Sequence, residues 1–201
     1  MGSQWDAAVA HLKAADAKLA ALIERVGPCR LEPTGVERPF EVLVETIVYQ
    51  QLTGKAAATI YGRVCKLFRG PLTPRKLLEA GEEKLRGAGL SGPKIRSIED
   101  LSARVQDGRL RLDELDALGD EELAARLIEV KGIGPWSVQM VMLFRLGRPD
   151  VWPVTDLGVR KGAQRVWGLR ELPGVDRLER LGKRLSPHRS VAAWYLWRAA
   201  E

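Results

Sequence analysis

Cysteine and histidine are scarce in this chain of 201 residues, which has two of each. Cys29 and Cys65 are far apart and show no Cys-x-x-Cys spacing, so we interpret them as structural thiols and not as a metal site or a disulfide. Because His11 and His188 are the only histidines, the sequence gives little support for a histidine metal centre or a Ser-His-Asp triad. Two cysteines also exclude an iron–sulfur cluster held by four thiolates.

Long apolar runs are missing as well. No stretch approaches the ~18 apolar residues of a membrane-spanning helix, and the first residues lack the apolar block of a signal peptide. We therefore expect a cytoplasmic protein, at the nucleoid if the source is bacterial, with no membrane partner. The charge balance of +6, from 32 Lys and Arg against 26 Asp and Glu, favours a polyanionic partner such as nucleic acid without proving one.

Helical periodicity runs through the whole sequence. Apolar residues recur at helical spacing within 5–25, and Thr73 with Pro74 is a typical start of a short helix. Thr53 is a candidate N-cap of another helix. Similar patterns predict helices over 40–52, 54–68, 82–88, 94–106, 120–130, 135–146, 156–166, 175–185 and 187–199. No alternating strand pattern competes over any length, so the fold class we predict is all-α.

The turn Lys131-Gly132-Ile133-Gly134-Pro135 carries the first functional signal. Its glycines can take φ > 0 and allow close approach of another molecule, and Pro135 suits the first position of a helix. The N–H groups at a helix start favour an anion such as a phosphate. On the turn alone, an ordinary corner between two helices is an equally good interpretation.

Asp156 stands 22 residues after Gly134, in a loop that contains proline and before an apparent helix. An Asp at that place is a good N-cap, which is the more ordinary interpretation of the residue in isolation. A catalytic role is compatible with capping, because a helix start stabilises a negative charge.

Four segments together resemble the helix-hairpin-helix base-excision DNA glycosylases, and most of all 3-methyladenine DNA glycosylase II. The resemblance covers roughly residues 36–200 and lies in 40–64, in 89–102, in the hairpin with Asp156, and in 186–197. It implies two helical lobes with the active site in the cleft between them. One lobe would be 36–137, and 1–35 plus 138–201 would form the other, which carries the catalytic Asp156.

The residue after Pro135 separates two chemistries in this superfamily. Bifunctional glycosylase/lyases have there a lysine that forms a Schiff base, whereas this chain has Trp136. Lys131 stands before the first glycine of the hairpin, so the resemblance implies that it contacts a phosphate or solvent instead. Hydrolysis by water is implied, with no required cofactor.

The resemblance also implies a pocket for the base and contacts to the DNA backbone. Trp136 and Trp197 fall on pocket positions and Tyr49 is a weaker candidate, although core packing is the usual fate of a single Trp. Electron-rich rings attract a cationic methylpurine. Met140 stands where the enterobacterial relative has a Tyr, which changes the shape of the pocket.

The segment from Leu90 to Lys94 resembles the wedge loop that fills the gap left by a flipped nucleotide. Gly92 replaces the expected bulky residue, so Leu90 or Pro93 would have to fill the gap, and a plain turn explains Ser-Gly-Pro equally well. Backbone N–H groups of Gly132 and Gly134 are the expected phosphate ligands. Relatives bind a monovalent cation at this turn, which here implies structural Na⁺ or K⁺ at the carbonyls of Ile128, Val130 and Ile133. Lys94, Arg96, Lys161, Arg165 and Arg189 could also reach phosphates, although solvated surface is their ordinary interpretation.

The sequence therefore predicts a monomeric, monofunctional DNA glycosylase that flips and hydrolytically excises alkylated purines of the 3-methyladenine and 7-methylguanine type from double-stranded DNA. Excision would leave an abasic site for base excision repair. Three alternatives stay open: a glycosylase for hypoxanthine or ethenoadenine, a non-catalytic helix-hairpin-helix DNA-binding module, and a helical scaffold protein that would leave the glycine turn and the positive charge unused.

Overall fold

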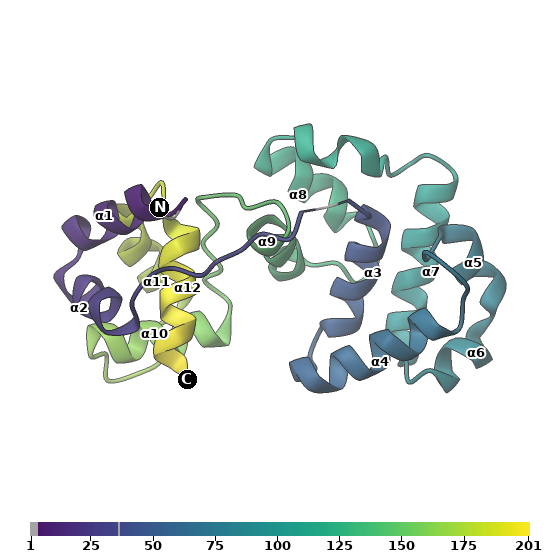
Figure 1. Ribbon diagram of the computed structural model, residues 1–201, viewed down its shortest axis with the longest axis horizontal. Coiled ribbons are helices and arrows are strands. Elements are labelled where there is room, and N and C mark those ends of the chain that lie inside the picture. The colour runs from purple at the N-terminus through teal and green to yellow at the C-terminus, as the bar shows by residue number, and fades with distance from the viewer. Residues whose placement is uncertain (1–3, 36) are drawn as a thin grey trace. The chain divides into compact units, whose positions relative to one another are not determined.

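The computed structural model describes residues 4–35 and 37–201, and this part of the chain contains helices and no strand (Figure 1). The predicted all-α class is confirmed. The elements are α1 Asp6–Ala15, α2 Ala17–Val26, α3 Pro39–Tyr49, α4 Gly54–Lys66, α5 Pro74–Ala80, α6 Glu82–Gly87, α7 Gly92–Gln106, the 3-10 helix η1 Leu112–Ala117, α8 Asp120–Ile128, α9 Pro135–Phe144, α10 Leu157–Trp167, α11 Val175–Gly182, the 3-10 turn η2 Lys183–Leu185, and α12 Arg189–Ala200.

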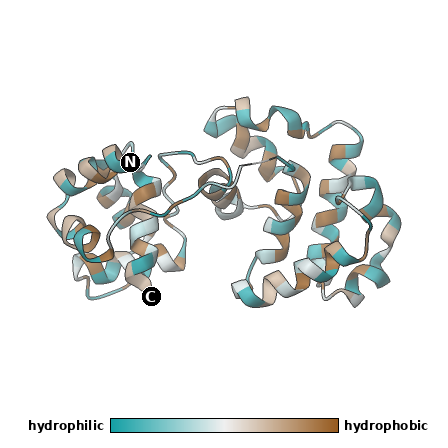
Figure 2. Ribbon diagram, in the orientation of Figure 1, coloured by the Kyte–Doolittle hydropathy of each residue, from teal (hydrophilic) through white to brown (hydrophobic). Residues whose placement is uncertain are grey.

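The contacts within the chain divide it into two compact units. Unit 1 is Met1–Thr34 with Met142–Glu201, and unit 2 is Gly35–Val141. The chain therefore passes from one unit to the other twice, once in the segment before α3 and once within α9. Helices of both units carry apolar and polar residues along their length (Figure 2). No helix among the described residues combines the length and apolar character that a membrane span requires.

Unit 1 is built on the packing of α10 against α12. Gly162 on α10 makes this possible, because an added Cβ would lie 2.0 Å from the Leu196 carbonyl oxygen on α12. Tyr195 of α12 is fully buried and donates its hydroxyl hydrogen to the Gly27 carbonyl oxygen at 2.9 Å. This close crossing holds the start of α10 next to the last turns of α12.

Unit 2 is organised around α7, which packs against α3, α5 and α6. Its buried face carries Ile95, Ile98 and Leu101 at helical spacing, and Leu43 and Ile47 of α3 belong to the same core. α7 also supports the turn between α8 and α9, so the core of this unit fixes the position of the predicted hairpin.

One predicted helix is divided in two for an identifiable reason, and one predicted N-cap makes no side-chain bond. The helix expected over 5–25 is interrupted at Asp16, whose backbone is extended and whose side chain accepts the Leu19 N–H at 2.8 Å, so that α2 begins there. Asp16 is buried and also accepts the indole N–H of Trp167, a partner 151 residues away that local periodicity does not reveal. Thr53 stands at the start of α4 but makes no capping bond with its side chain, whereas Thr73 accepts the Lys76 N–H as expected.

Candidate functional site

Asp156 is the N-cap of α10, as its ordinary interpretation requires. Its Oδ1 accepts the backbone N–H of Val159 at 2.8 Å, which satisfies one of the free donors at the helix start. The same oxygen accepts the indole N–H of Trp197 at 2.8 Å. Two donors from two different helices therefore fix the orientation of this carboxylate.

Trp197 is held on its face as well as at its nitrogen. Its ring stacks on Phe144 with centroids 5.3 Å apart and an angle of 26° between the planes. Gly158 leaves room for this arrangement, since an added Cβ would lie 2.6 Å from Trp197 Cδ1 and 3.1 Å from Asp156 Oδ1. Phe144 was not among the predicted site residues, and its only signal in the sequence is the four-residue interval that separates it from Met140.

A hollow of about 540 Å³ opens on unit 1 beside this tryptophan. Leu157, the residue after the capping Asp, is 52% exposed at its edge. The lining combines aromatic rings with cationic and apolar side chains: Phe144, Leu157, Gly158, Lys161, Trp194, Trp197, Arg198, Ala200 and Glu201. An aromatic wall next to an oriented carboxylate suits a flat, electron-poor ligand.

The hairpin turn of unit 2 is held by several side chains. Gly132 has φ +80, and Ser97 of α7 lies against it. The Lys131 N–H donates to Asp100 Oδ2 at 2.8 Å. Burial alone would raise the pKa of Asp100, but this bond and Arg104 outweigh it and lower the pKa. The carbonyl oxygen of Gly132 accepts Gln50 Nε2 at 2.9 Å, which ties the end of α3 to the turn.

The two hairpin glycines differ in backbone conformation, although the sequence allows φ > 0 at either. Gly134 lies outside the left-handed region, and a Cβ added to it would meet nothing within 4 Å. Only at position 132 does the backbone conformation favour glycine. The Val130 carbonyl accepts the Ile133 N–H at 3.0 Å, and no group of three metal-ligating side chains occurs among the described residues. A monovalent cation at the carbonyls of Ile128, Val130 and Ile133 stays a prediction.

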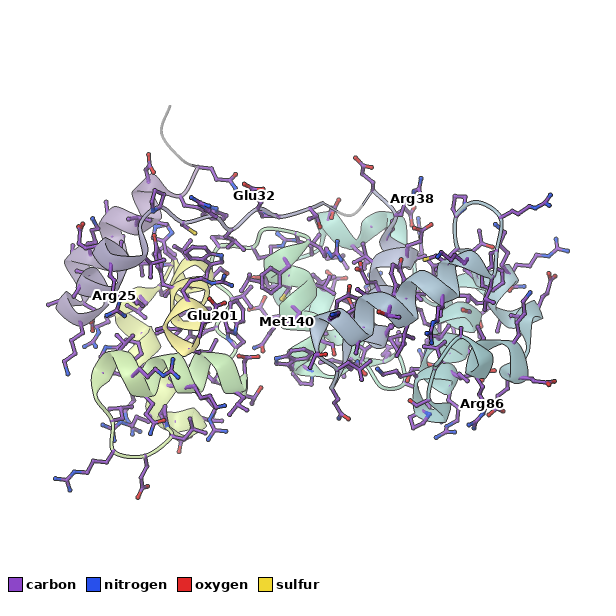
Figure 3. The ribbon with its side chains drawn as sticks, turned by 60° about the horizontal axis from the view of Figure 1, so that its bottom comes forward. Arg25, Glu32, Arg38, Arg86, Met140 and Glu201 are labelled. Carbon is purple, nitrogen blue, oxygen red and sulfur yellow. The ribbon has the colours of Figure 1, made fainter. Side chains whose placement is uncertain are left out.

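The other pocket candidates belong to unit 2. Trp136 is 36% exposed near the start of α9, and the half-buried Met140 lies one turn further on (Figure 3). Tyr49 ends α3, next to Gln50, whose Nε2 also lies 3.0 Å from Ser137 Oγ. The structure thus joins Trp197 to Asp156 in unit 1, and it gathers Trp136, Met140 and Tyr49 in the unit that carries the hairpin.

The wedge prediction is wrong for Leu90. This side chain is only 3% exposed and belongs to the core of unit 2, so extracting it would sacrifice apolar packing. Gly92 is buried and Pro93 is exposed. A loop that the sequence did not single out has the more distinctive geometry: Gln51 between α3 and α4 has φ +57, which is unusual for a residue with a side chain, and the adjacent Leu52 is 39% exposed.

Some of the predicted phosphate ligands are engaged inside the protein. Lys94 Nζ donates to the Val48 carbonyl at 2.6 Å, and desolvation lowers the pKa of this amine. Arg189 makes a bidentate ion pair with Asp150 at 2.8 Å, so its guanidinium is committed. Arg165 donates to the Ala199 carbonyl. Arg96 and Lys161 are exposed.

Comparison with known proteins assigns the family. Residues 44–188 match the HhH-GPD superfamily base excision DNA repair protein family. The chain is 31% identical to the alkylbase DNA glycosidase-like protein mag2 of Schizosaccharomyces pombe, over 97% of this chain and 93% of that protein. A DNA-3-methyladenine glycosidase of Bacillus halodurans is 41% identical, covering 96% and 88% of the two chains with a TM-score of 0.84.

A solved structure also shows a related protein with DNA. The 3-methyladenine DNA glycosylase of Schizosaccharomyces pombe in complex with abasic DNA is 32% identical, covers 95% of each chain and has a TM-score of 0.89. The predicted resemblance is confirmed, and this chain belongs to the HhH-GPD superfamily of base excision DNA repair proteins, among relatives named as 3-methyladenine DNA glycosylases.

Proposed function

We propose that this protein is a monofunctional DNA glycosylase that excises alkylated purines from double-stranded DNA. The observation that carries the proposal is the Asp156 carboxylate, which Trp197 and Val159 orient through Oδ1 beside an aromatic wall. Membership of the superfamily makes a damaged base the expected ligand of such a site. The related glycosylase solved with abasic DNA supports DNA as the partner.

The proposed reaction begins with extrusion of the damaged nucleotide from the duplex, at a cost of a few kcal/mol that a poorly paired base reduces. Alkylation at N3 or N7 gives the purine a positive charge, which aromatic faces such as those of Trp136 and Trp197 attract. When the C1′–N bond breaks, the bonding electrons leave with the purine, which departs as a neutral base. This step needs no general acid.

The sugar is left with positive charge at C1′, as in glycoside hydrolysis. The Asp156 carboxylate stabilises that charge, and it can take the proton released when water forms the new C1′–O bond. The proposed reaction has no lysine-dependent lyase step, because the resemblance places Trp136 at the Schiff-base position. Lys131 lies after α8, and its backbone N–H donates to Asp100. The products are a free base and an abasic site.

We propose that the loop between α3 and α4, and not Leu90, fills the gap left by the flipped nucleotide. Gln51 has the strained φ of +57 and Leu52 exposes a large apolar side chain, while Gln50 anchors the same loop to the hairpin. Strain of this kind persists where the surrounding structure imposes it, and it is common at functional sites. Gln51→Ala with Leu52→Ala should reduce excision from duplex DNA more than from single strands, whereas Pro93→Ala should affect both little.

The experiment that tests the function is release of bases from methylated duplex DNA, with the products separated by chromatography. Parallel substrates carry hypoxanthine or ethenoadenine at one position. Release of 3-methyladenine or 7-methylguanine supports the proposal, and release of only the other lesions would replace its substrate class. DNA binding without release of any base would favour a non-catalytic module.

A further inference from the structure

The turn between α6 and α7 is built like the hairpin turn between α8 and α9. In each, a glycine in the left-handed region is followed by a buried apolar residue and then by a Gly-Pro pair at the start of a long helix. Gly89 has φ +104 and Gly132 has φ +80, and Leu90 and Ile133 are 3% and 4% exposed. Ser91 is the one additional residue of the α6–α7 turn. Unit 2 thus contains two turns of similar construction.

The α6–α7 turn is also the centre of a basic stretch. From 84 to 98 the sequence contains Lys84, Arg86, Lys94 and Arg96 and no acidic residue. Lys84 lies over the Phe68 ring and Lys94 donates to the Val48 carbonyl, so both have internal partners. Arg86 and Arg96 are both exposed.

These two guanidinium groups converge over Gly92. The position that a Cβ would take there lies 3.1 Å from Arg86 Nη2 and 3.3 Å from Arg96 Nη1. Arg86 uses its Nε for an exposed ion pair with Glu82 at 2.7 Å, which leaves Nη2 directed at the turn. Arg96 has neither a hydrogen bond nor an ion pair among the residues that the structure describes. Like charges held this close repel one another unless an anion lies between them.

We propose that Arg86 and Arg96 bind a backbone phosphate of DNA and form a second phosphate-binding site beside the hairpin. The assignment rests on the proposed function only in taking DNA as the partner. Guanidinium groups present planar sets of N–H donors that match phosphate oxygens, and they bind them more strongly than neutral donors do. Arg86 lies at the surface of unit 2 (Figure 3), where such an anion has free access.

The position of the pair relative to the hairpin fits a single duplex. Ser97 lies against Gly132, and it is five residues beyond Gly92 on the same helix α7. Five residues correspond to about 7.5 Å of helix axis. One strand of DNA rises about 3.4 Å per nucleotide, so a spacing of this size is compatible with two nearby phosphates of one duplex. Gly92 and Arg96 share a face of α7 that adjoins the face carrying Pro93 and Ser97.

The first test is Arg86→Gln with Arg96→Gln, titrated with undamaged and lesion-containing duplexes. We expect affinity for both DNAs to fall by a similar factor of about ten at low salt, because a phosphate contact carries no sequence information. Losing one neutralised phosphate lowers the salt slope by about 0.9. The affinity ratio between parent and variant should therefore shrink about threefold between about 50 mM and about 200 mM salt.

The matched control removes the same charge elsewhere on unit 2. Arg75 and Arg111 are exposed and lie beside carboxylates, as Arg86 does. Arg111 shares Glu114 with Arg126, so a carboxylate already lies between those two guanidinium groups. Arg75→Gln with Arg111→Gln should change affinity by less than about twofold, since only long-range electrostatics are lost. An equal loss of affinity in the control variant would show that net charge alone explains the effect, and it would overturn the assignment.

A second variant keeps both charges and disturbs only their convergence. Gly92→Ala places a methyl group at the point where the two guanidinium groups meet, and their flexible ends can move away without unfolding the helix. It should weaken DNA binding with an unchanged melting temperature, whereas Gly87→Ala, whose Cβ meets nothing within 4 Å, should not. Parent-like binding by both the Gln double variant and Gly92→Ala would overturn the proposal. Because the readout is binding, a parent protein that released no base would overturn the proposed activity and leave this test interpretable.

Discussion

Gly132→Ala is the substitution for which the structure gives the most definite expectation. The residue has φ +80, and an added Cβ would lie 2.2 Å from Ser97 Oγ and 3.2 Å from Ser97 Cβ. Two separate penalties therefore act on one methyl group: the left-handed backbone and the collision with α7. Gly134, two residues on, has neither penalty.

The magnitude follows from these two terms. A left-handed conformation costs a residue with a side chain about 1–2 kcal/mol. Inserting a methyl group into a packed contact costs about 1–3 kcal/mol. Their sum predicts that Gly132→Ala lowers the free energy of unfolding by about 2–5 kcal/mol, and in a chain of this size the melting temperature falls by about 2–4 °C per kcal/mol.

Thermal melting of a small set of variants separates the two terms. Ser97→Ala together with Gly132→Ala removes the Oγ collision but leaves the backbone strain, so it should recover about half of the loss. Gly134→Ala should lower the stability by less than about 1 kcal/mol, the typical scale of a cap effect. If the backbone of Gly134 contacts a phosphate, Gly134→Ala should still weaken binding to damaged and undamaged DNA alike.

Two outcomes would refute this reasoning about the hairpin. A Gly132→Ala variant that melts like the parent would show that the turn can take another conformation at no cost. A Gly134→Ala variant that binds DNA as the parent does, at several salt concentrations and with unchanged melting, would make the turn a structural corner.

Borohydride should trap no protein–DNA adduct, because the resemblance places Trp136 at the position of the lyase lysine. An adduct seen on a denaturing gel would contradict this. Gly158→Ala should reduce base release by about 10–100-fold, since a methyl group 2.6 Å from Trp197 Cδ1 displaces a side chain that orients the carboxylate. Burial would raise the pKa of Asp150, but hydrogen bonds from Arg189 outweigh it and hold the pKa below its usual value. The stability that Asp150 contributes should therefore be complete at neutral pH and disappear as the pH falls below about 4, which chemical denaturation of Asp150→Asn and the parent at several pH values would measure.

Matched controls keep the last two of these predictions specific. Gly174→Ala adds a methyl group that meets nothing within 4 Å in the same unit, so it should release base at the parental rate. For Asp150→Asn, the difference in unfolding free energy from the parent should narrow with acidification. A difference that stays constant down to low pH would show that the ion pair is not the source of the stability.

Local chemistry explains how much of this site could be predicted from the sequence. Asp156 caps a helix through a bond to Val159, and Thr73 caps another through Lys76, because both interactions join residues three apart. Helical periodicity likewise located most of the helices. The glycine turn was recognisable because so few residues accept the backbone that Gly132 adopts.

Long-range packing explains the rest. The bond from Trp197 to Asp156 joins residues 41 apart, and neither residue's local pattern indicates it. Leu90 looked available in the sequence because it stands beside Ser-Gly-Pro, yet the core of unit 2 buries it. The strain at Gln51 depends on how α3 and α4 are placed, and no residue type nearby signals it.

The measurement that tests the central claim most directly is single-turnover release of base from methylated DNA by the parent and by Asp156→Asn. Asn keeps an Oδ1 that can accept from Val159 and Trp197 and is as good an N-cap as Asp, so folding should be unchanged. We predict a rate at least about 100-fold lower, with parental melting and DNA binding, because the charge that stabilises the sugar cation is gone. An Asn variant that melts normally and releases base at nearly the parental rate would contradict the account.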